Sequence, residues 1–113
     1  MSVTNRDLGS PDETKTFDHG RVDVVRIGAI TFNRSTLEPG WRWSQDIKPI
    51  ARTESCQVHH VGFLLSGRLG VSTQDGGEAE IRPGEVYEIQ PGHEGWVVGG
   101  EPVVSIELLG TVS

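Results

Sequence analysis

The sequence predicts an all-β domain, built as a small sandwich or barrel of about eight strands. Short runs of β-branched and apolar residues follow one another from Arg21 onward, with the length and alternation of strands. Turns such as Pro83-Gly84 and Pro91-Gly92 separate these runs and supply the backbone angles that tight reversals need. Amphipathic helical periodicity is nearly absent. The chain has 113 residues, a length typical of one domain.

The elements are predicted in chain order. Residues 1–20 are polar and have few apolar side chains to bury, so they are predicted to form an N-terminal arm that leans on another surface. Residues 21–113 are predicted to form a single domain. Segment 41–55 is predicted to be a long rim loop, because it is polar and contains Pro49, and long loops in compact domains are often functional. The predicted strands are 22–27, 29–37, 57–65, 69–73, 78–81, 86–89, 95–98 and 103–109.

Composition and charge exclude several functions. Ten Lys and Arg against 16 Asp and Glu give a net charge of -6, the wrong sign for binding phosphates, so no nucleic-acid partner is expected. Residues 1–10 lack the features of a signal peptide, and no apolar run is long enough to span a membrane. We therefore expect a cytoplasmic location and no membrane partner. The single cysteine, Cys56, agrees with a reducing compartment.

The ordered turns resemble the two sequence motifs of small single-domain cupins. LSGR (65–68), DGG (75–77), RPGE (82–85) and QPGH (90–93) follow one another at the spacing of that family. The PGWRWS segment (39–44) and the PGHEGW segment (91–96) are similar to those of actinobacterial-type cupins. The resemblance covers roughly residues 38–109. It implies a double-stranded β-helix, a jelly-roll-like small barrel whose inward polar residues form one pocket.

The resemblance also implies a metal site, because many cupins hold a divalent ion with two His and a Glu from the first motif and a His from the second. Here the position of the motif glutamate is His60, and the two preceding histidine positions fall on Glu54 and Cys56. The second-motif position falls on Gly95, but His93 lies two residues earlier and shares its face in an extended strand. The candidate metal ligands are therefore His60, His93, Cys56 and Glu54.

Strand alternation agrees with this set, because it places Glu54, Cys56 and His60 on one face and His59 on the other. Two His, a Cys and a carboxylate suit zinc, and two His with one carboxylate suit iron. Nickel and manganese are the other candidate ions. The alternative interpretation is structural: a buried His bonded to the backbone, and a free Cys packed as a small apolar group.

Four aromatic residues are candidates for the pocket wall: Trp41, Trp43, Tyr87 and Trp96. Trp41 and Trp43 share a face if their segment is extended, where they would form an apolar wall against a planar ligand. The alternative is that the tryptophans plug the end of the barrel. The direction of Tyr87 depends on the strand register.

Three functions remain open from the sequence, because a fold does not determine a function. The first is a metal-dependent isomerase, dioxygenase or lyase acting on a small oxygenated substrate. The second is a metal-free module that binds or senses a small molecule. The third is a structural dimerisation module. The expected partners are a small-molecule ligand and a second copy of the chain, since small cupins commonly pair and open sheet edges need covering.

Overall fold

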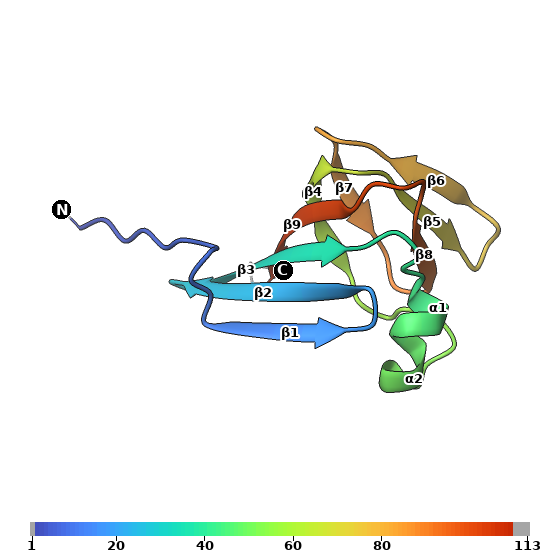
Figure 1. Ribbon diagram of the computed structural model, residues 1–113, viewed down its shortest axis with the longest axis horizontal. Helices are drawn as coiled ribbons and strands as arrows, with labels where there is room; N and C mark the ends of the chain where they lie inside the picture. The colour runs from blue at the N-terminus through green and yellow to red at the C-terminus, as the bar shows by residue number, and fades with distance from the viewer. Residues whose placement is uncertain (1, 110–113) are drawn as a thin grey trace.

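The computed structural model describes residues 2–109 as two antiparallel β-sheets (Figure 1). The larger sheet has six strands in the order β1-β2-β3-β9-β4-β7, and the smaller has three in the order β6-β5-β8. The last four residues of the predicted domain, 110–113, and residue 1 of the predicted arm lie outside the described residues. The strands are β1 (Glu13–Phe17), β2 (Gly20–Ile27), β3 (Ile30–Leu37), β4 (His60–Ser66), β5 (Leu69–Thr73), β6 (Glu78–Ile81), β7 (Val86–Ile89), β8 (His93–Val97) and β9 (Val103–Leu109).

The core lies between the two sheets. Leu64 and Val103 of the larger sheet are almost completely buried, and they belong to one apolar cluster with Leu69 and Val71 of the smaller sheet. Burying one such side chain stabilises the fold by about 1.5–3 kcal/mol. Gly67 lets the β4–β5 turn approach the chain before β9, because its φ is 78° and a Cβ there would lie 2.2 Å from the Pro102 carbonyl oxygen.

All eight predicted strands are confirmed, and their ends differ from the prediction by at most three residues. The largest difference is in β4, which begins at His60 instead of residue 57. Strand β8 begins at His93 instead of residue 95. Both differences fall next to candidate metal ligands, so they decide which side chains face the interior.

Strand β1 was not predicted, because its residues were placed in the N-terminal arm. It alternates charged residues and threonines before Phe17, and this polar pattern gives little strand signal. The strand pairs with β2 along its whole length, from Glu13 opposite Val24 to Phe17 opposite Gly20. It stands at the edge of the larger sheet, where polar side chains discourage pairing with other chains.

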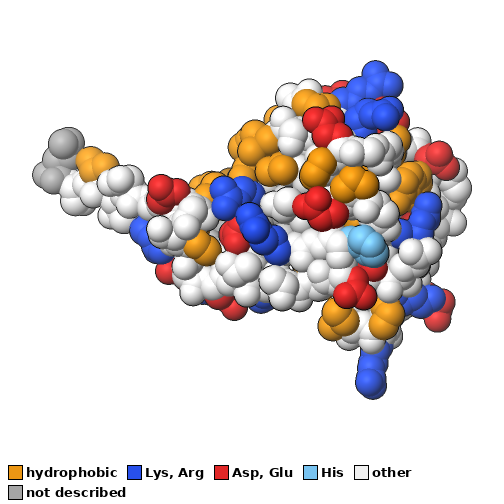
Figure 2. All heavy atoms as spheres, viewed as in Figure 1, with side chains coloured by type: hydrophobic (Ala, Val, Ile, Leu, Met, Phe, Trp, Pro, Cys, Tyr) orange, Lys and Arg blue, Asp and Glu red, His pale blue; other side chains and the backbone are white. Residues whose placement is uncertain are grey.

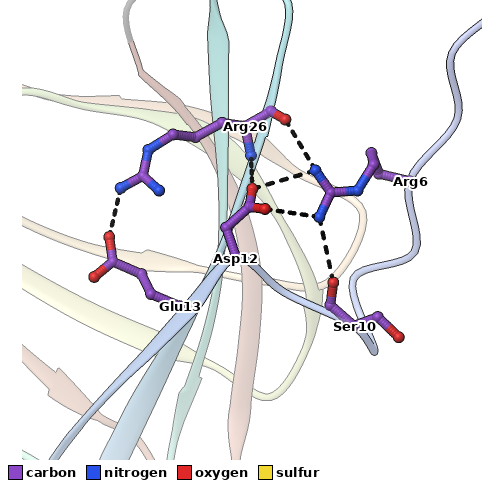
Figure 3. A network of polar contacts seen from close by, with 5 residues as sticks. All are labelled: Arg6, Ser10, Asp12, Glu13 and Arg26. Atoms are coloured by element: carbon purple, nitrogen blue, oxygen red, sulfur yellow. Dashed lines mark hydrogen bonds and ion pairs between the residues drawn. The ribbon is translucent and has the colours of Figure 1, made fainter.

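The chain before β1 is anchored by Arg6. Figure 3 shows its guanidinium donating to the Asp12 carboxylate at 2.9 Å and to the backbone oxygen of Arg26 at 3.3 Å. The same carboxylate accepts a hydrogen bond from the Arg26 backbone N–H at 2.7 Å. The Arg6 hydrogen bond is the main reason why the pKa of Asp12 lies below its usual value. Residues 2–5, which precede Arg6, run away from the sheets (Figure 1).

The rim segment is ordered and partly helical, so the prediction of a plain loop over 41–55 was wrong. It contains α1 (Trp43–Asp46) and α2 (Lys48–Ala51). The Asp46 carboxylate accepts the backbone N–H of Arg42 at 3.0 Å, and Pro49 sits in the first turn of α2, where a missing N–H costs nothing. Each helix has four residues, too few for a periodic signal. Neither they nor any other described stretch forms a helix of the length and hydropathy that crossing a membrane requires.

Candidate functional site

A cavity of about 350 Å³ lies between the two sheets, and the α1–α2 segment forms part of its wall. Its walls are mainly apolar and come from both sheets and from the rim. Polar side chains of the metal-ligand type also line it: Cys56, His60, His93 and Glu107. The cavity therefore combines an apolar chamber with one group of chemically active side chains.

Three of the predicted ligands meet in this cavity. The ligand atoms of Cys56, His60 and His93 all lie within 4.8 Å of one another. Cys56 and His93 are held together by the backbone, because the Cys56 N–H donates to the His93 oxygen at 2.8 Å. His60 is the first residue of β4, and its ring meets the His93 ring edge-on with the centroids 5.0 Å apart.

Each histidine ring is fixed by a hydrogen bond at Nδ1. His60 Nδ1 lies 2.7 Å from Glu107 Oε1, and its Nε2 lies 3.6 Å from the Cys56 sulfur. His93 Nδ1 lies 2.7 Å from the backbone oxygen of Gln90. A carbonyl oxygen only accepts, so Nδ1 of His93 carries a proton, and its Nε2 is the ring nitrogen left for other contacts. Such second partners orient histidines as metal ligands.

The charges in the cluster depend on close pairing. Burial alone would raise the pKa of the Cys56 thiol, but hydrogen bonds with His60 and His93 outweigh it and lower the pKa to about 6. Burial alone would lower the pKa of His60, but Cys56 and Glu107 raise it to about 9. At neutral pH the cluster therefore holds a thiolate beside an imidazolium.

Glu107 is a site residue that the sequence analysis missed. One oxygen contacts His60, and the other accepts a hydrogen bond from the Tyr87 hydroxyl at 2.7 Å. Gly62 stands between Tyr87 and Glu107 in the register of β7, β4 and β9. A Cβ at Gly62 would lie 2.9 Å from the Glu107 side chain and 2.2 Å from the Ile106 oxygen. The glycine therefore makes room for the Tyr87–Glu107 contact.

Glu54 does not join the cluster, which corrects its prediction as a ligand. Its side chain is 90% exposed and pairs with Lys48 at 3.2 Å. The alternation argument fails because residues 57–59 are not in a strand, so faces cannot be counted back from His60 to Glu54. The carboxylate beside His60 is that of Glu107, 47 residues later in the chain. His59 turns outward and pairs with Glu88 at 2.8 Å.

The four candidate aromatic residues separate into two groups. Trp41 and Trp43 are buried and line the cavity. Trp96 does not line it: its ring packs on Gly70, and the Arg42 guanidinium lies over its face at 4.9 Å. Tyr87 also does not line this cavity, and it contributes instead to a second, more open cavity beside β5 and β6. The pocket assignments of Trp96 and Tyr87 are therefore corrected.

Comparison with known proteins identifies the fold. No protein-family model and no curated protein matches the sequence. AerE from Microcystis aeruginosa is similar in structure, with a TM-score of 0.61 and 21% identity over 85% of this chain. A protein of unknown function from Rhizobium leguminosarum has a TM-score of 0.62 and 23% identity over 96% of both chains. This chain spans only 43% of the length of AerE.

A third similar structure carries a fold name. It is an RmlC-like cupin with a double-stranded β-helix fold from Methanocaldococcus jannaschii, with a TM-score of 0.57 and 8% identity over 83% of this chain and 87% of that one. Its double-stranded β-helix agrees with the two antiparallel sheets of this chain. The chain therefore has the cupin fold, a double-stranded β-helix of the jelly-roll type.

Proposed function

We propose that the protein is a metal-dependent cupin in which Cys56, His60 and His93 hold a divalent ion at one end of a small-molecule pocket. The observation that carries the proposal is the convergence of one ligand atom each from Cys56, His60 and His93, all within 4.8 Å of one another. Metal binding would displace the proton that His60 Nε2 shares with the Cys56 sulfur. Each ring is already oriented by a partner at Nδ1, Glu107 for His60 and the Gln90 oxygen for His93.

The donor set favours zinc over iron, nickel or manganese. Zinc binds nitrogen and sulfur ligands, whereas manganese prefers carboxylates and water. The carboxylate expected for an iron site of two His and one carboxylate, that of Glu54, points into solvent. Three protein ligands leave one position open, which is characteristic of catalytic zinc sites and not of structural ones.

The surrounding residues support catalysis on a small substrate. When bound, the ion would supply a Lewis acid for an oxygen or nitrogen atom of the substrate. Glu107 holds the His60 ring and accepts the Tyr87 hydroxyl, so it keeps His60 in one orientation. Because zinc does no redox chemistry, we propose an isomerase or lyase in preference to a dioxygenase. A thiolate ligand agrees with a reducing compartment, and we propose a cytoplasmic location.

The test is elemental analysis of protein purified without an affinity tag, before and after incubation with zinc. We expect close to one zinc per chain. Cys56→Ser, His60→Ala and His93→Ala should each lose most of the metal while keeping the β-sheet circular dichroism spectrum. The matched controls are His59→Ala, next to His60 but turned outward, and Glu54→Ala; both should retain the metal. Zinc-free wild-type protein after reconstitution would overturn the proposal.

A metal-free binding protein is the second candidate, and the Cys56–His60 pair favours it. The thiolate and the imidazolium satisfy each other without an ion, so the cluster is stable as a polar floor of the pocket. This function predicts ligand binding that is unchanged by chelators. The cavity of about 350 Å³ weighs against the remaining alternative, a barrel plugged by its own side chains.

A further inference from the structure

We propose that the substrate of this pocket is a small and mainly apolar molecule that carries one polar group, directed at Cys56, His60 and His93, and no charge elsewhere. The inference rests on the proposed function and specifies the ligand class that it leaves open. It follows from how polar and apolar side chains are distributed around the cavity, and from the lack of Lys and Arg among the described residues that line it.

Apolar side chains come into the cavity from every side. Val22 and Leu37 belong to the larger sheet, and Leu69 and Val71 belong to the smaller one. The rim adds its own apolar side chains, among them those of Trp41, Trp43 and Ile47. A sugar or other polyol placed here would lose water at several hydroxyls and gain few hydrogen bonds, at a cost of roughly 1–3 kcal/mol for each unpaired group. The walls therefore select an apolar body.

Two polar wall residues near the rim, Thr53 and Gln57, are already occupied, whereas the buried Nε1 of Trp41 has no hydrogen-bond partner. The Thr53 hydroxyl donates to the Ser55 backbone oxygen at 2.8 Å. The Gln57 side-chain amide donates to the Ser55 hydroxyl at 3.0 Å. Both residues line the cavity, but their donors are directed at Ser55. The polar end of a ligand is thus directed to the cluster of Cys56 and the two histidines.

No Lys or Arg is among the described residues that line the cavity. The nearby cations have other partners: Arg42 lies over Trp96 and pairs with Glu94 at 3.7 Å, and Lys48 pairs with the exposed Glu54. When the polar group of the ligand lies at Cys56, His60 and His93, a carboxylate or phosphate elsewhere on the ligand would be buried in the apolar chamber without a counter-charge, which is strongly unfavourable. A cationic group on the ligand is also disfavoured, because both oxygens of the Glu107 carboxylate already have partners, His60 and Tyr87.

The size of the cavity limits the ligand further. About 350 Å³ is near the lower end of the roughly 300–1,000 Å³ found for ligand pockets. At about 30 Å³ for each water-sized group, the space holds roughly a dozen such groups. A single substituted ring with one oxygen or nitrogen function fits these limits, and a nucleotide does not.

The test is calorimetric titration of the zinc-loaded full chain with three probes that share a zinc-binding head. They are imidazole, 4-phenylimidazole and imidazole-4-acetate. We expect 4-phenylimidazole to bind at least about tenfold tighter than imidazole, because its ring is buried on apolar walls. Imidazole-4-acetate should bind no tighter than imidazole. Tighter binding of imidazole-4-acetate than of 4-phenylimidazole would overturn the inference.

A charge placed at the cavity mouth gives a matched comparison. Val58 lines the cavity and is 49% exposed, so Val58→Lys should fold and bring an ammonium to the mouth. We expect it to raise the affinity for imidazole-4-acetate at least about threefold. Val3→Lys, on the exposed N-terminal segment, should leave both affinities unchanged. Equal effects of the two lysines would contradict a specific, uncharged pocket.

Metal-free protein separates this inference from the proposed function. Toluene and benzoate carry no zinc-binding head, so their binding can be measured without an ion. We expect toluene to bind the Cys56→Ser variant and benzoate not to bind it. If this variant fails to fold, chelator-treated wild-type protein takes its place. Toluene binding in a protein that never takes up zinc keeps the apolar pocket and overturns the metal centre. Zinc uptake together with preference for the charged probes keeps the metal centre and overturns the ligand class.

Discussion

The Cys56 thiol and the His60 imidazole set each other's charge across 3.6 Å. The pKa of Cys56 falls to about 6 on folding, so its stabilising contribution is present at alkaline pH and is lost as the pH falls through 6. The pKa of His60 rises to about 9, so its contribution is present at acidic pH and is lost as the pH rises through 9. The pair therefore stabilises the metal-free protein most between these two values.

Thiolate absorbance in the far ultraviolet checks this directly, because Cys56 is the only cysteine in the chain. A titration of metal-free protein should show a midpoint at about 6. His60→Ala should move the midpoint upward toward the ordinary value of about 8.5, since the imidazolium is lost. His59→Ala should leave it in place. A wild-type midpoint near the ordinary value would mean that the pair is not formed.

Glu107 and Glu88 offer a matched pair of carboxylates, because each contacts a histidine. Glu107 contacts His60 at 2.7 Å, and Glu88 contacts the outward His59 at 2.8 Å. We expect Glu107→Gln to weaken zinc binding by roughly 10–100-fold, the usual effect of removing the partner that orients a ligand histidine. Glu88→Gln should have no effect. Competition with a chromophoric chelator measures the zinc affinity of both variants. Equal zinc affinities of the two variants would show that Glu107 does not orient a metal ligand.

Sequence reasoning found most, but not all, of these residues. Cys56 and His60 were found because they occupy ligand positions of the first cupin motif, and His93 because it ends the QPGH turn. Glu54 was misplaced because alternation was extended into a segment that is not a strand. Glu107 lies in β9, far from any motif, and only the pairing of β9 with β4 brings it to His60. Long-range pairing of this kind leaves no local signal in one sequence.

Strands β1, β2 and β3 are joined by one buried carboxylate. Asp23 of β2 is 4% exposed; it accepts the Thr14 hydroxyl of β1 at 2.8 Å and the Arg34 guanidinium of β3 at 3.0 Å. Burial works to raise its pKa, but these two hydrogen bonds prevail and lower it. The stabilisation is present at neutral pH and is lost as the pH falls below the ordinary carboxyl pKa of about 3.9.

Asp23→Asn should therefore lower the free energy of unfolding by about 1–3 kcal/mol at neutral pH. The difference from wild type should shrink in acid, where Asp23 of the wild type is protonated as well. Urea unfolding at both pH values measures it. Asp18→Asn, in the exposed β1–β2 turn, is the control and should cost little. A difference that stays constant with pH would show that the Asp23 charge is not what joins the strands.

Strands could be predicted from the sequence where clear Gly and Pro turn signals bound them. Gly67 and Gly84 both have positive φ. In the sequence, Gly67 marks the end of β4, and Gly84 marks the turn before β7. The two rim helices escaped prediction because four residues cannot show a period of 3.6. Strand β1 escaped because its side chains are mostly polar, and its order comes from pairing with β2 and not from local propensity.

At the scale of the whole molecule, the outer face of the larger sheet is apolar and uncovered over β4 and β7. Val61, Phe63, Leu65 and Val86 are all exposed there, Val86 by 80%, and β7 is an edge strand. Figure 2 shows hydrophobic side chains gathered on this part of the globular body. Contiguous exposed apolar residues on a sheet edge are typical of interfaces. We propose that a second copy of the chain covers this face.

Light scattering coupled to gel filtration should therefore give twice the mass of 12.3 kDa. The double variant Leu65→Glu, Val86→Glu should elute as a monomer, because both carboxylates would have to be buried between the copies. Ile50→Glu, exposed on α2 and away from this face, is the control and should stay dimeric. A monomeric wild type at micromolar concentration would contradict the proposal.

The placement of the ligand cluster has a mechanical consequence. His60 belongs to β4 of the larger sheet, and His93 belongs to β8 of the smaller one, so an ion held by both would fasten the two sheets together. Binding only to the closed arrangement would add about 4 kcal/mol of stability when the free ion exceeds its dissociation constant a thousandfold. Amide hydrogen exchange should then slow together in β4 and β8, while β1, at the far edge, keeps its own local opening. The ion would thus stabilise the packing of the two sheets in addition to taking part in the reaction.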